Sequence, residues 1–343
     1  MFEHILGHEA QKAFLQSYLK AKERPHALLF CGAEGLGKKQ LAFSFAKVLL
    51  CASHTGEDGC EACRLMHVQA EGTVSHPDFL LVQREFNEDT KRYKDISIEQ
   101  IRDLNTQAGT GAVMSATRVC IIEAADRMSL GAANSFLKLL EEPPAGWVMI
   151  LLATSAEKLL PTILSRVVQL RFQPVALSLV ERALQEKKVP AAQAAVLARL
   201  SEGSIGRAVR LYAPEGQNKE NVFAYREQAA AFLEALPLDA PMNYLAKRLW
   251  LNGKLLRDDA VLMVQLWQLL LHDLLLCKLQ LYDKIYNVDL VESLSAQAQG
   301  WQLQALRKAL RCVDAAYAAL ESSVSVKVAL EAMALKIDEA YKE

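Results

Sequence analysis

Residues 32–39 have the glycine spacing of a phosphate-binding loop. They read Gly-Ala-Glu-Gly-Leu-Gly-Lys-Lys, which places glycines at Gly32, Gly35 and Gly37 and a lysine at Lys38. Glycines let successive backbone N–H groups face an anion, and the N-terminus of a following helix adds positive potential. A lysine in this position can reach the outer phosphates of a nucleotide. The spacing therefore predicts a nucleotide loop that joins a strand to a helix.

Two positions that an ATPase needs are changed. The last loop position normally carries Ser or Thr, whose hydroxyl binds Mg²⁺, but here it is Lys39. The apolar run 119–122 ends in Glu123 and Ala124 instead of Asp-Glu, so the carboxylate that orients the attacking water is missing. We expect neither Mg²⁺ binding nor ATP hydrolysis. Two alternatives stay open, namely a loop retained only for its shape and a loop that binds ATP or ADP without turnover.

Asp126, further along, is expected to cap a helix that starts near Met128.

The elements that must position these residues follow from apolar runs. Short runs at 27–31, 79–82, 118–122 and 148–152 alternate with longer amphipathic segments. This pattern is typical of buried parallel strands with crossover helices. We therefore predict an α/β nucleotide-binding domain at 1–173, a small helical lid at 174–215 and an all-helical domain at 216–343. The apolar stretch 262–281 is interrupted by polar residues, so it is expected to be a buried helix and not a membrane span.

Composition excludes several classes of protein. The chain has 343 residues, a net charge of −1 and 23% charged residues, which argues against a disordered chain and against a uniformly basic nucleic-acid binder. Any contact with DNA must come from a local patch. The N-terminus has no basic stretch followed by an apolar run, so no signal peptide is predicted and the protein is expected to be cytoplasmic, without a membrane partner.

Several motifs together resemble the AAA+ clamp-loader family, in particular its bacterial DNA polymerase III branch of delta-prime and gamma/tau subunits. The motifs are Pro-His-Ala-Leu-Leu-Phe at 25–30, His-Pro-Asp-Phe at 76–79, Ile-Glu-Gln-Ile-Arg at 98–102, Asn-Ser-Phe-Leu-Lys-Leu-Leu-Glu-Glu-Pro-Pro at 134–144 and Leu-Ser-Arg at 164–166. The resemblance implies an AAA+ domain, a helical lid and a helical collar that mediates oligomerisation. Residues 326–333 resemble the closing helix of that collar.

The resemblance also implies roles for individual residues. Ser165 and Arg166 match the family's Ser-Arg-Cys motif, with Val167 in place of the cysteine, so Arg166 is expected to act as an arginine finger on a neighbouring subunit's ATP. Judged from the residues alone, Arg166 could equally form a surface ion pair. Thr154 matches a nucleotide-sensing position. Gly206 stands where ATP-hydrolysing members carry a second sensor arginine, and Arg207 is displaced by one residue, as in delta-prime chains.

Three of the seven cysteines are clustered at Cys51, Cys60 and Cys63, whereas disulfides are not expected in a reducing cytoplasm. Their spacing resembles the first three ligands of the zinc module inserted in this family at about 51–67. A structural zinc needs four ligands, and the fourth position is Met66. His67 is the best substitute, with His54 and solvent as weaker ones. The alternatives are a structural zinc and a degenerate loop with free thiols. Cys31, Cys120, Cys277 and Cys312 are expected to fill core or surface positions.

These inferences predict a subunit that is not an ATPase on its own. It is expected to assemble with gamma/tau and delta subunits, to help load the sliding clamp onto primed DNA during replication, and to supply Arg166 in trans. The alternative is an ATP-hydrolysing gamma/tau-like motor, against which Lys39 and Ala124 speak. A helical scaffold without any link to nucleotide does not explain the intact glycine spacing.

Overall fold

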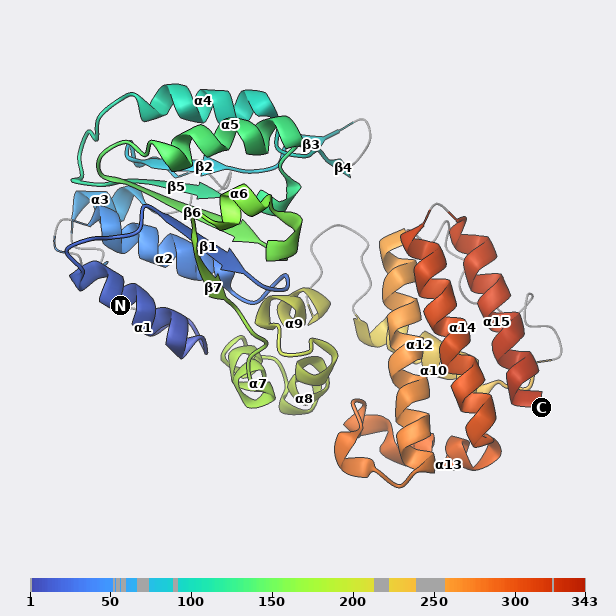
Figure 1. The fold of residues 1–343 in the computed structure, drawn as a ribbon. Helices are drawn as coiled ribbons and strands as arrows, with labels where there is room; N and C mark the ends of the chain where they lie inside the picture. The colour runs from blue at the N-terminus through green and yellow to red at the C-terminus, as the bar shows by residue number, and fades with distance from the viewer. Residues whose placement is uncertain are drawn as a thin grey trace. The chain divides into compact units, whose positions relative to one another are not determined.

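The computed structural model describes residues 2–51, 53, 56, 60–66, 74–88, 92–212, 222–238, 257–322 and 324–342 (Figure 1). Two compact units emerge, the first made of residues 1–183 and 203–207 and the second of residues 184–202 and 208–343. The predicted boundary at 215/216 lies outside the described residues, and the division into three domains stays a prediction. His67 and His54 also lie outside the described residues.

The first unit is built on a five-stranded parallel sheet. Its strands are β1 (Ala27–Cys31), β2 (Phe79–Val82), β5 (Arg118–Ile122), β6 (Trp147–Ala153) and β7 (Val168–Arg171). The order across the sheet is β2-β5-β6-β1-β7, so β1 is an inner strand. A parallel sheet of this kind binds ligands at the carboxyl ends of its strands, where the loop after β1 lies.

Three of the predicted apolar runs coincide with β1, β2 and β5, and the fourth lies within β6. Strand β7 was not predicted, because its residues Val-Gln-Leu-Arg alternate and do not form a continuous apolar run. Strand β7 pairs with β1 and lies at the edge of the sheet, where a strand can be buried on one face only.

Helices cover both faces of the sheet (Figure 1). They are α1 (Glu9–Lys20), α2 (Lys38–Leu50), α3 (Glu61–Leu65), α4 (Ile98–Ala108), α5 (Leu130–Glu141) and α6 (Pro161–Leu164), with short 3-10 turns η1 (Ala125–Arg127) and η2 (Ala156–Lys158). Alternate residues of β1 point into two cores. Leu28 and Phe30 pack with α1 and α2, while Leu29 packs with α4 and α5. All three side chains are fully buried, and each such burial stabilises the fold by about 1.5–3 kcal/mol.

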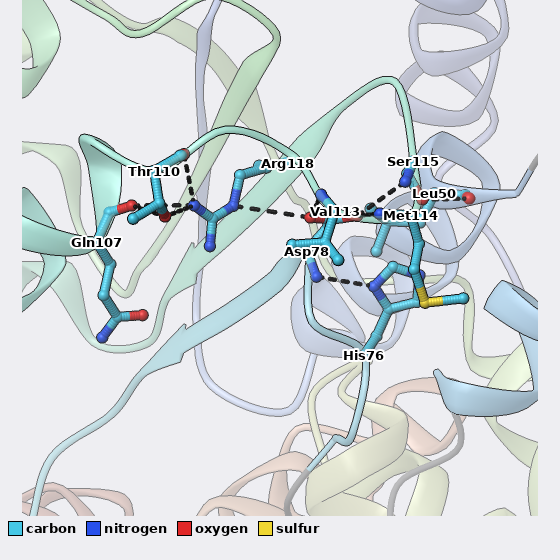
Figure 2. A network of polar contacts seen from close by, with 9 residues as sticks. All are labelled: Leu50, His76, Asp78, Gln107, Thr110, Val113, Met114, Ser115 and Arg118. Carbon is cyan, nitrogen blue, oxygen red and sulfur yellow. Dashed lines mark hydrogen bonds and ion pairs between the residues drawn. The ribbon is translucent and has the colours of Figure 1, made fainter.

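A buried carboxylate fixes the loop between α4 and β5 (Figure 2). Asp78 is fully buried and accepts backbone hydrogen bonds from Val113, Met114 and Ser115. The guanidinium of Arg118 lies 3.9 Å from the same carboxylate. Asp78 belongs to the His-Pro-Asp-Phe motif, so that motif has a structural role here in holding the loop.

The first unit also contains a short antiparallel hairpin, β3 (Phe86–Asn87) with β4 (Arg92–Tyr93), which the sequence did not predict. The helix predicted to begin at Ile98 is α4, and Ser97 and Gln100 form a capping box at its start.

Helices dominate the rest of the chain. The stretch predicted as the lid contains α7 (Leu177–Glu186), α8 (Ala191–Leu200) and α9 (Ile205–Tyr212). The described helices that follow are α10 (Val222–Glu234), α12 (Arg257–Lys278), α13 (Val291–Gly300), α14 (Leu303–Glu321) and α15 (Val326–Lys342), with 3-10 turns η3 (Tyr282–Lys284) and η4 (Val288–Leu290). Helix α12 packs against α10, α13 and α14.

Helix α12 is the buried helix that the sequence predicted. Among the described residues, α12 is the helix that is long and apolar enough to span a membrane. However, 61% of its most apolar stretch is buried inside the protein. Trp267 in its middle is fully buried and donates its indole N–H to the carbonyl of Ala229 at 3.0 Å. These contacts identify α12 as a core helix.

Candidate functional site

The predicted nucleotide loop lies at the carboxyl end of β1 and leads into α2, whose N-cap is Gly37. Two of its glycines are required by close contacts. A Cβ at Gly32 would lie 2.5 Å from the carbonyl oxygen of Phe172, and a Cβ at Gly35 would lie 2.4 Å from the hydroxyl of Ser204. Gly35 also has φ +77°, a conformation that favours glycine. The glycine spacing therefore serves the packing of the loop as well as its shape.

Lys38 is folded back onto its own loop. Its Nζ donates hydrogen bonds to the carbonyls of Gly32 at 2.5 Å and Ala33 at 2.6 Å, and the residue is only 9% exposed. Burial lowers the pKa of Lys38, although the nearby carboxylates of Glu34 and Asp126 oppose the shift. The cation that would hold outer phosphates is engaged by the protein itself.

The remaining loop carbonyls accept hydrogen bonds from distant parts of the first unit. The hydroxyl of Ser204 donates to Glu34 O at 3.0 Å, and the backbone N–H of Gly206 donates to Gly35 O at 2.9 Å. The Nε2 of His8 lies 2.7 Å from Leu36 O. Burial lowers the pKa of His8, although the hydrogen bond to Leu36 O opposes the shift. Five consecutive carbonyls, from 32 to 36, are thus satisfied within the chain.

The close approach of Gly206 to the loop leaves no room for a side chain at this position. A Cβ at Gly206 would lie 2.8 Å from the Cα of Gly35 and 2.9 Å from its carbonyl oxygen. These are backbone atoms that cannot move aside as a flexible side chain could. No larger residue fits at 206 while the segment 203–207 packs on the loop. Arg207, the displaced arginine, donates its backbone N–H to Ser204 Oγ at 3.2 Å.

Lys39 and Glu123, which the sequence places at the two expected Mg²⁺ positions, form an ion pair. Lys39 Nζ lies 2.6 Å from Glu123 Oε1, and the side chains are 57% and 21% exposed. A lysine ammonium therefore stands next to the carboxylate that occupies the metal-binding position of the strand. Ala124, the position of the missing water-orienting glutamate, has φ 52° and ψ 48°.

Thr154 and Asp126 form a second polar contact at the same end of the sheet. Thr154 Oγ1 donates to Asp126 Oδ2 at 2.5 Å. The prediction that Asp126 caps a helix was wrong. Asp126 lies within η1, and Ser129 caps α5 by accepting a hydrogen bond from Ala132 N at 3.2 Å. Ser129 directly precedes the first turn of α5, so its hydroxyl reaches the free N–H groups there.

Arg166 lies on the surface just after α6. Its Nη1 donates to the carbonyl of Thr162 at 2.9 Å and to Ser165 Oγ at 3.1 Å. Its Nη2 lies 2.9 Å from Glu141 Oε1, with the side chains 36% and 51% exposed. Ser165 is therefore a direct partner of the arginine, and Glu141 is a residue whose contact the sequence did not predict.

The three clustered cysteines converge as predicted. Their sulfur atoms all lie within 4.8 Å of one another. Cys60 Sγ lies 3.7 Å from Cys51 Sγ, which matches the edge of about 3.8 Å expected for two thiolates that share a tetrahedral zinc at ~2.3 Å. Cys60 caps α3, and its sulfur accepts a hydrogen bond from Cys63 N at 3.3 Å. Met66 is 6% exposed and packs in the hydrophobic core.

Two thiols of this cluster have pKa values that are shifted in opposite directions. Burial would raise the pKa of Cys51, but hydrogen bonds from Ser53, Gly56 and Cys63 outweigh it and hold the pKa at about 5. Burial, together with Cys60 and Cys51, raises the pKa of Cys63 to about 12. The low pKa of Cys51 beside the high pKa of Cys63 describes one thiolate that neighbouring thiols stabilise. The thiolate is the form that binds metal.

The chain is similar to subunits of bacterial DNA polymerase III. The family model described as "DNA polymerase III, delta subunit" matches residues 7–176. The delta-prime subunit of Pseudomonas aeruginosa DNA polymerase III is 35% identical over 62% of this chain and 61% of its own length. The delta-prime subunit of Bacillus subtilis is 29% identical over 92% of this chain and 91% of its own length. The tau subunit of Bacillus subtilis is 30% identical over 51% of this chain and 29% of its own length.

The parallel sheet and the glycine-spaced loop at the end of β1 give the strand–loop–helix arrangement of a phosphate-loop nucleotide-binding fold. The Bacillus subtilis delta-prime subunit matches nearly the whole chain, whereas the tau subunit of the same organism matches about half of it. The chain is thus similar to delta-prime subunits of DNA polymerase III, and the matching family model spans residues 7–176.

Proposed function

We propose that this protein is a non-hydrolysing clamp-loader subunit that assembles with gamma/tau and delta subunits in the cytoplasm. In that complex it helps to load the sliding clamp onto primed DNA and supplies Arg166 to a neighbour's ATP site. The observation that carries the proposal is the Lys39–Glu123 ion pair, in which a lysine ammonium lies 2.6 Å from the carboxylate that would be expected to bind Mg²⁺. The exposed arginine after α6 supports the role in trans.

The loop geometry supports a role in which nucleotide is not required. The loop carbonyls accept hydrogen bonds from within the chain, donated by Lys38, Ser204, Gly206 and His8. The loop therefore keeps its form through protein contacts. The alternative, an ATP-hydrolysing gamma/tau-like motor, would need a metal-binding hydroxyl and a water-orienting carboxylate. Lys39 and Ala124 occupy those positions.

Reconstitution tests the proposal. The gamma/tau and delta subunits are assembled with and without this chain, and DNA-stimulated ATPase and clamp loading are measured on primed DNA. We expect loading only when this chain is present. Equal loading without it would overturn the proposed function.

The isolated chain is expected to show no ATP turnover above the blank. Lys39→Thr alone should not restore turnover, because Ala124 still provides no carboxylate to orient water. Phosphate release from purified protein, with and without Mg²⁺, measures this. Turnover that Lys38→Ala abolishes would contradict the prediction, whereas binding of nucleotide without turnover agrees with it.

A structural zinc fits the cysteine cluster, and we propose Cys51, Cys60, Cys63 and His67 as its ligands. Elemental analysis of protein purified without chelator should find about one zinc per chain. Cys63→Ser should abolish zinc binding, and His67→Ala should weaken it by about tenfold or more in competition with a chromogenic chelator. Met66→Leu is the matched control, because Met66 packs in the core.

Protein without zinc would show that the cluster is a set of free thiols. If zinc is present and His67→Ala binds it as tightly as the unaltered protein, only the fourth ligand is wrong.

A further inference from the structure

Glu141 is the carboxylate partner of the exposed arginine, and its position is unusual for a glutamate. It is the last residue of α5, where the helix dipole is negative and a carboxylate is unfavourable. Its Oε1 lies 2.9 Å from Nη2 of Arg166. Both side chains are substantially exposed, and exposed ion pairs contribute little to stability. Stability alone therefore does not account for this arrangement.

The contacts of Arg166 hold one part of its guanidinium and leave another part free. Nη1 donates to Thr162 O and Ser165 Oγ, and Nη2 donates to Glu141. Arginine has five N–H donors in a rigid planar fork. In the described part of the chain, the Nε–H and the second N–H of Nη2 have no acceptor. Two donors therefore remain for an anion outside the subunit.

We propose that Glu141 is a positioning residue that orients the guanidinium of Arg166 toward a phosphate group of a neighbouring subunit's nucleotide. This inference rests on the proposed role of Arg166 in trans. A long arginine side chain on a surface samples many rotamers, and each of them except the productive one lowers the rate. Glu141 and Thr162 O fix the side chain from two directions, one on α5 and one on α6. The arginine is thus pre-oriented before a neighbour binds.

The experiment uses the complete complex with gamma/tau and delta subunits, with kcat and KM for ATP measured on primed DNA. Five forms of this chain are compared, namely Glu141→Ala, Glu141→Gln, Glu142→Ala, Arg166→Ala and the double variant with Glu141→Ala and Arg166→Ala. Glu142 is the matched control because it is the adjacent glutamate, and its side chain makes no contact in the described part of the chain. Gel filtration and thermal melting check assembly and folding.

Glu141→Ala should lower turnover at the site that Arg166 serves by roughly threefold to tenfold, through kcat and with KM for ATP little changed. Glu141→Gln keeps an oxygen acceptor for Nη2 and should retain most of the rate. Glu142→Ala should behave as the unaltered protein. The double variant should match Arg166→Ala alone, because Glu141 acts through the arginine.

The outcomes separate this inference from the proposed function. Normal turnover in Glu141→Ala together with a defect in Arg166→Ala would overturn the positioning role and leave the proposed function standing. Normal turnover in both variants would overturn the arginine's role in trans itself. A double variant that is slower than Arg166→Ala by the full effect of Glu141→Ala would show that Glu141 acts by another route.

Discussion

Replacing Asp78 with alanine should destabilise the first unit by about 3–5 kcal/mol, the usual effect of removing one partner of a buried ion pair. The carboxylate is fully buried and accepts N–H groups from Val113, Met114 and Ser115 at 2.7–2.8 Å. Its loss leaves three N–H groups without acceptors and Arg118 without its counter-ion (Figure 2). Urea unfolding followed by hydrogen exchange in β2 and β5 measures the change in the first unit alone.

Asp95→Ala is the control for this substitution. The Asp95 side chain is 61% exposed, and its carboxylate lies 3.6 Å from Arg84. An exposed pair of this kind contributes about 1 kcal/mol or less. Equal losses of stability in Asp78→Ala and Asp95→Ala would contradict the structural role of the buried carboxylate.

The same carboxylate predicts how stability depends on pH. Burial by itself would raise the pKa of Asp78, but the hydrogen bonds from Val113, Met114 and Ser115 outweigh burial and lower it. The unfolded chain therefore binds a proton at a higher pH than the folded chain does. The contribution of Asp78 is fully present above its unfolded pKa of about 3.9 and is lost as the pH falls toward the folded value. Asp78→Asn should remove this part of the acid dependence.

Local patterns in the sequence were enough to predict the sheet and the loop. The bounds of β1, β2 and β5 were predicted from nearly continuous apolar runs, because strands buried on both faces consist mostly of apolar residues. The glycines and Lys38 were found by spacing alone. The alternating edge strand β7 and the two-residue strands β3 and β4 were missed, because their signals are short or one-sided.

The contacts that complete the site are long-range and could not be read from spacing. Ser204 meets Glu34 across 170 positions, and His8 meets Leu36 across 28. Asp126 was assigned as a cap because a carboxylate before a helix commonly is one, yet Ser129 stood closer to the first turn. The sequence did identify Lys39 and Glu123 as altered, but only the fold shows that they pair.

Arg166→Ala should give the largest loss of activity in the assembled complex. An arginine finger stabilises charge that develops in the transition state, and its removal slows the affected site by about 10³–10⁵ where the arginine is decisive. A clamp loader has several ATP sites, so the fall in total turnover is smaller. Arg166→Lys should not rescue the activity, because an ammonium cannot reproduce the planar fork that Thr162, Ser165 and Glu141 hold.

Folding and assembly should survive this substitution, since the side chain is 36% exposed and its ion pair is a surface pair. Arg64→Ala serves as the control, because Arg64 is an exposed arginine on α3 whose side chain makes no contact in the described part of the chain. Gel filtration verifies assembly, and phosphate release in the same preparation gives turnover. If Arg166→Ala assembles correctly and retains normal ATPase and loading, the arginine is only half of a surface ion pair with Glu141. If turnover falls while the Arg64→Ala complex is normal, the chain contributes chemistry to a neighbour although its own loop has lost the groups for hydrolysis.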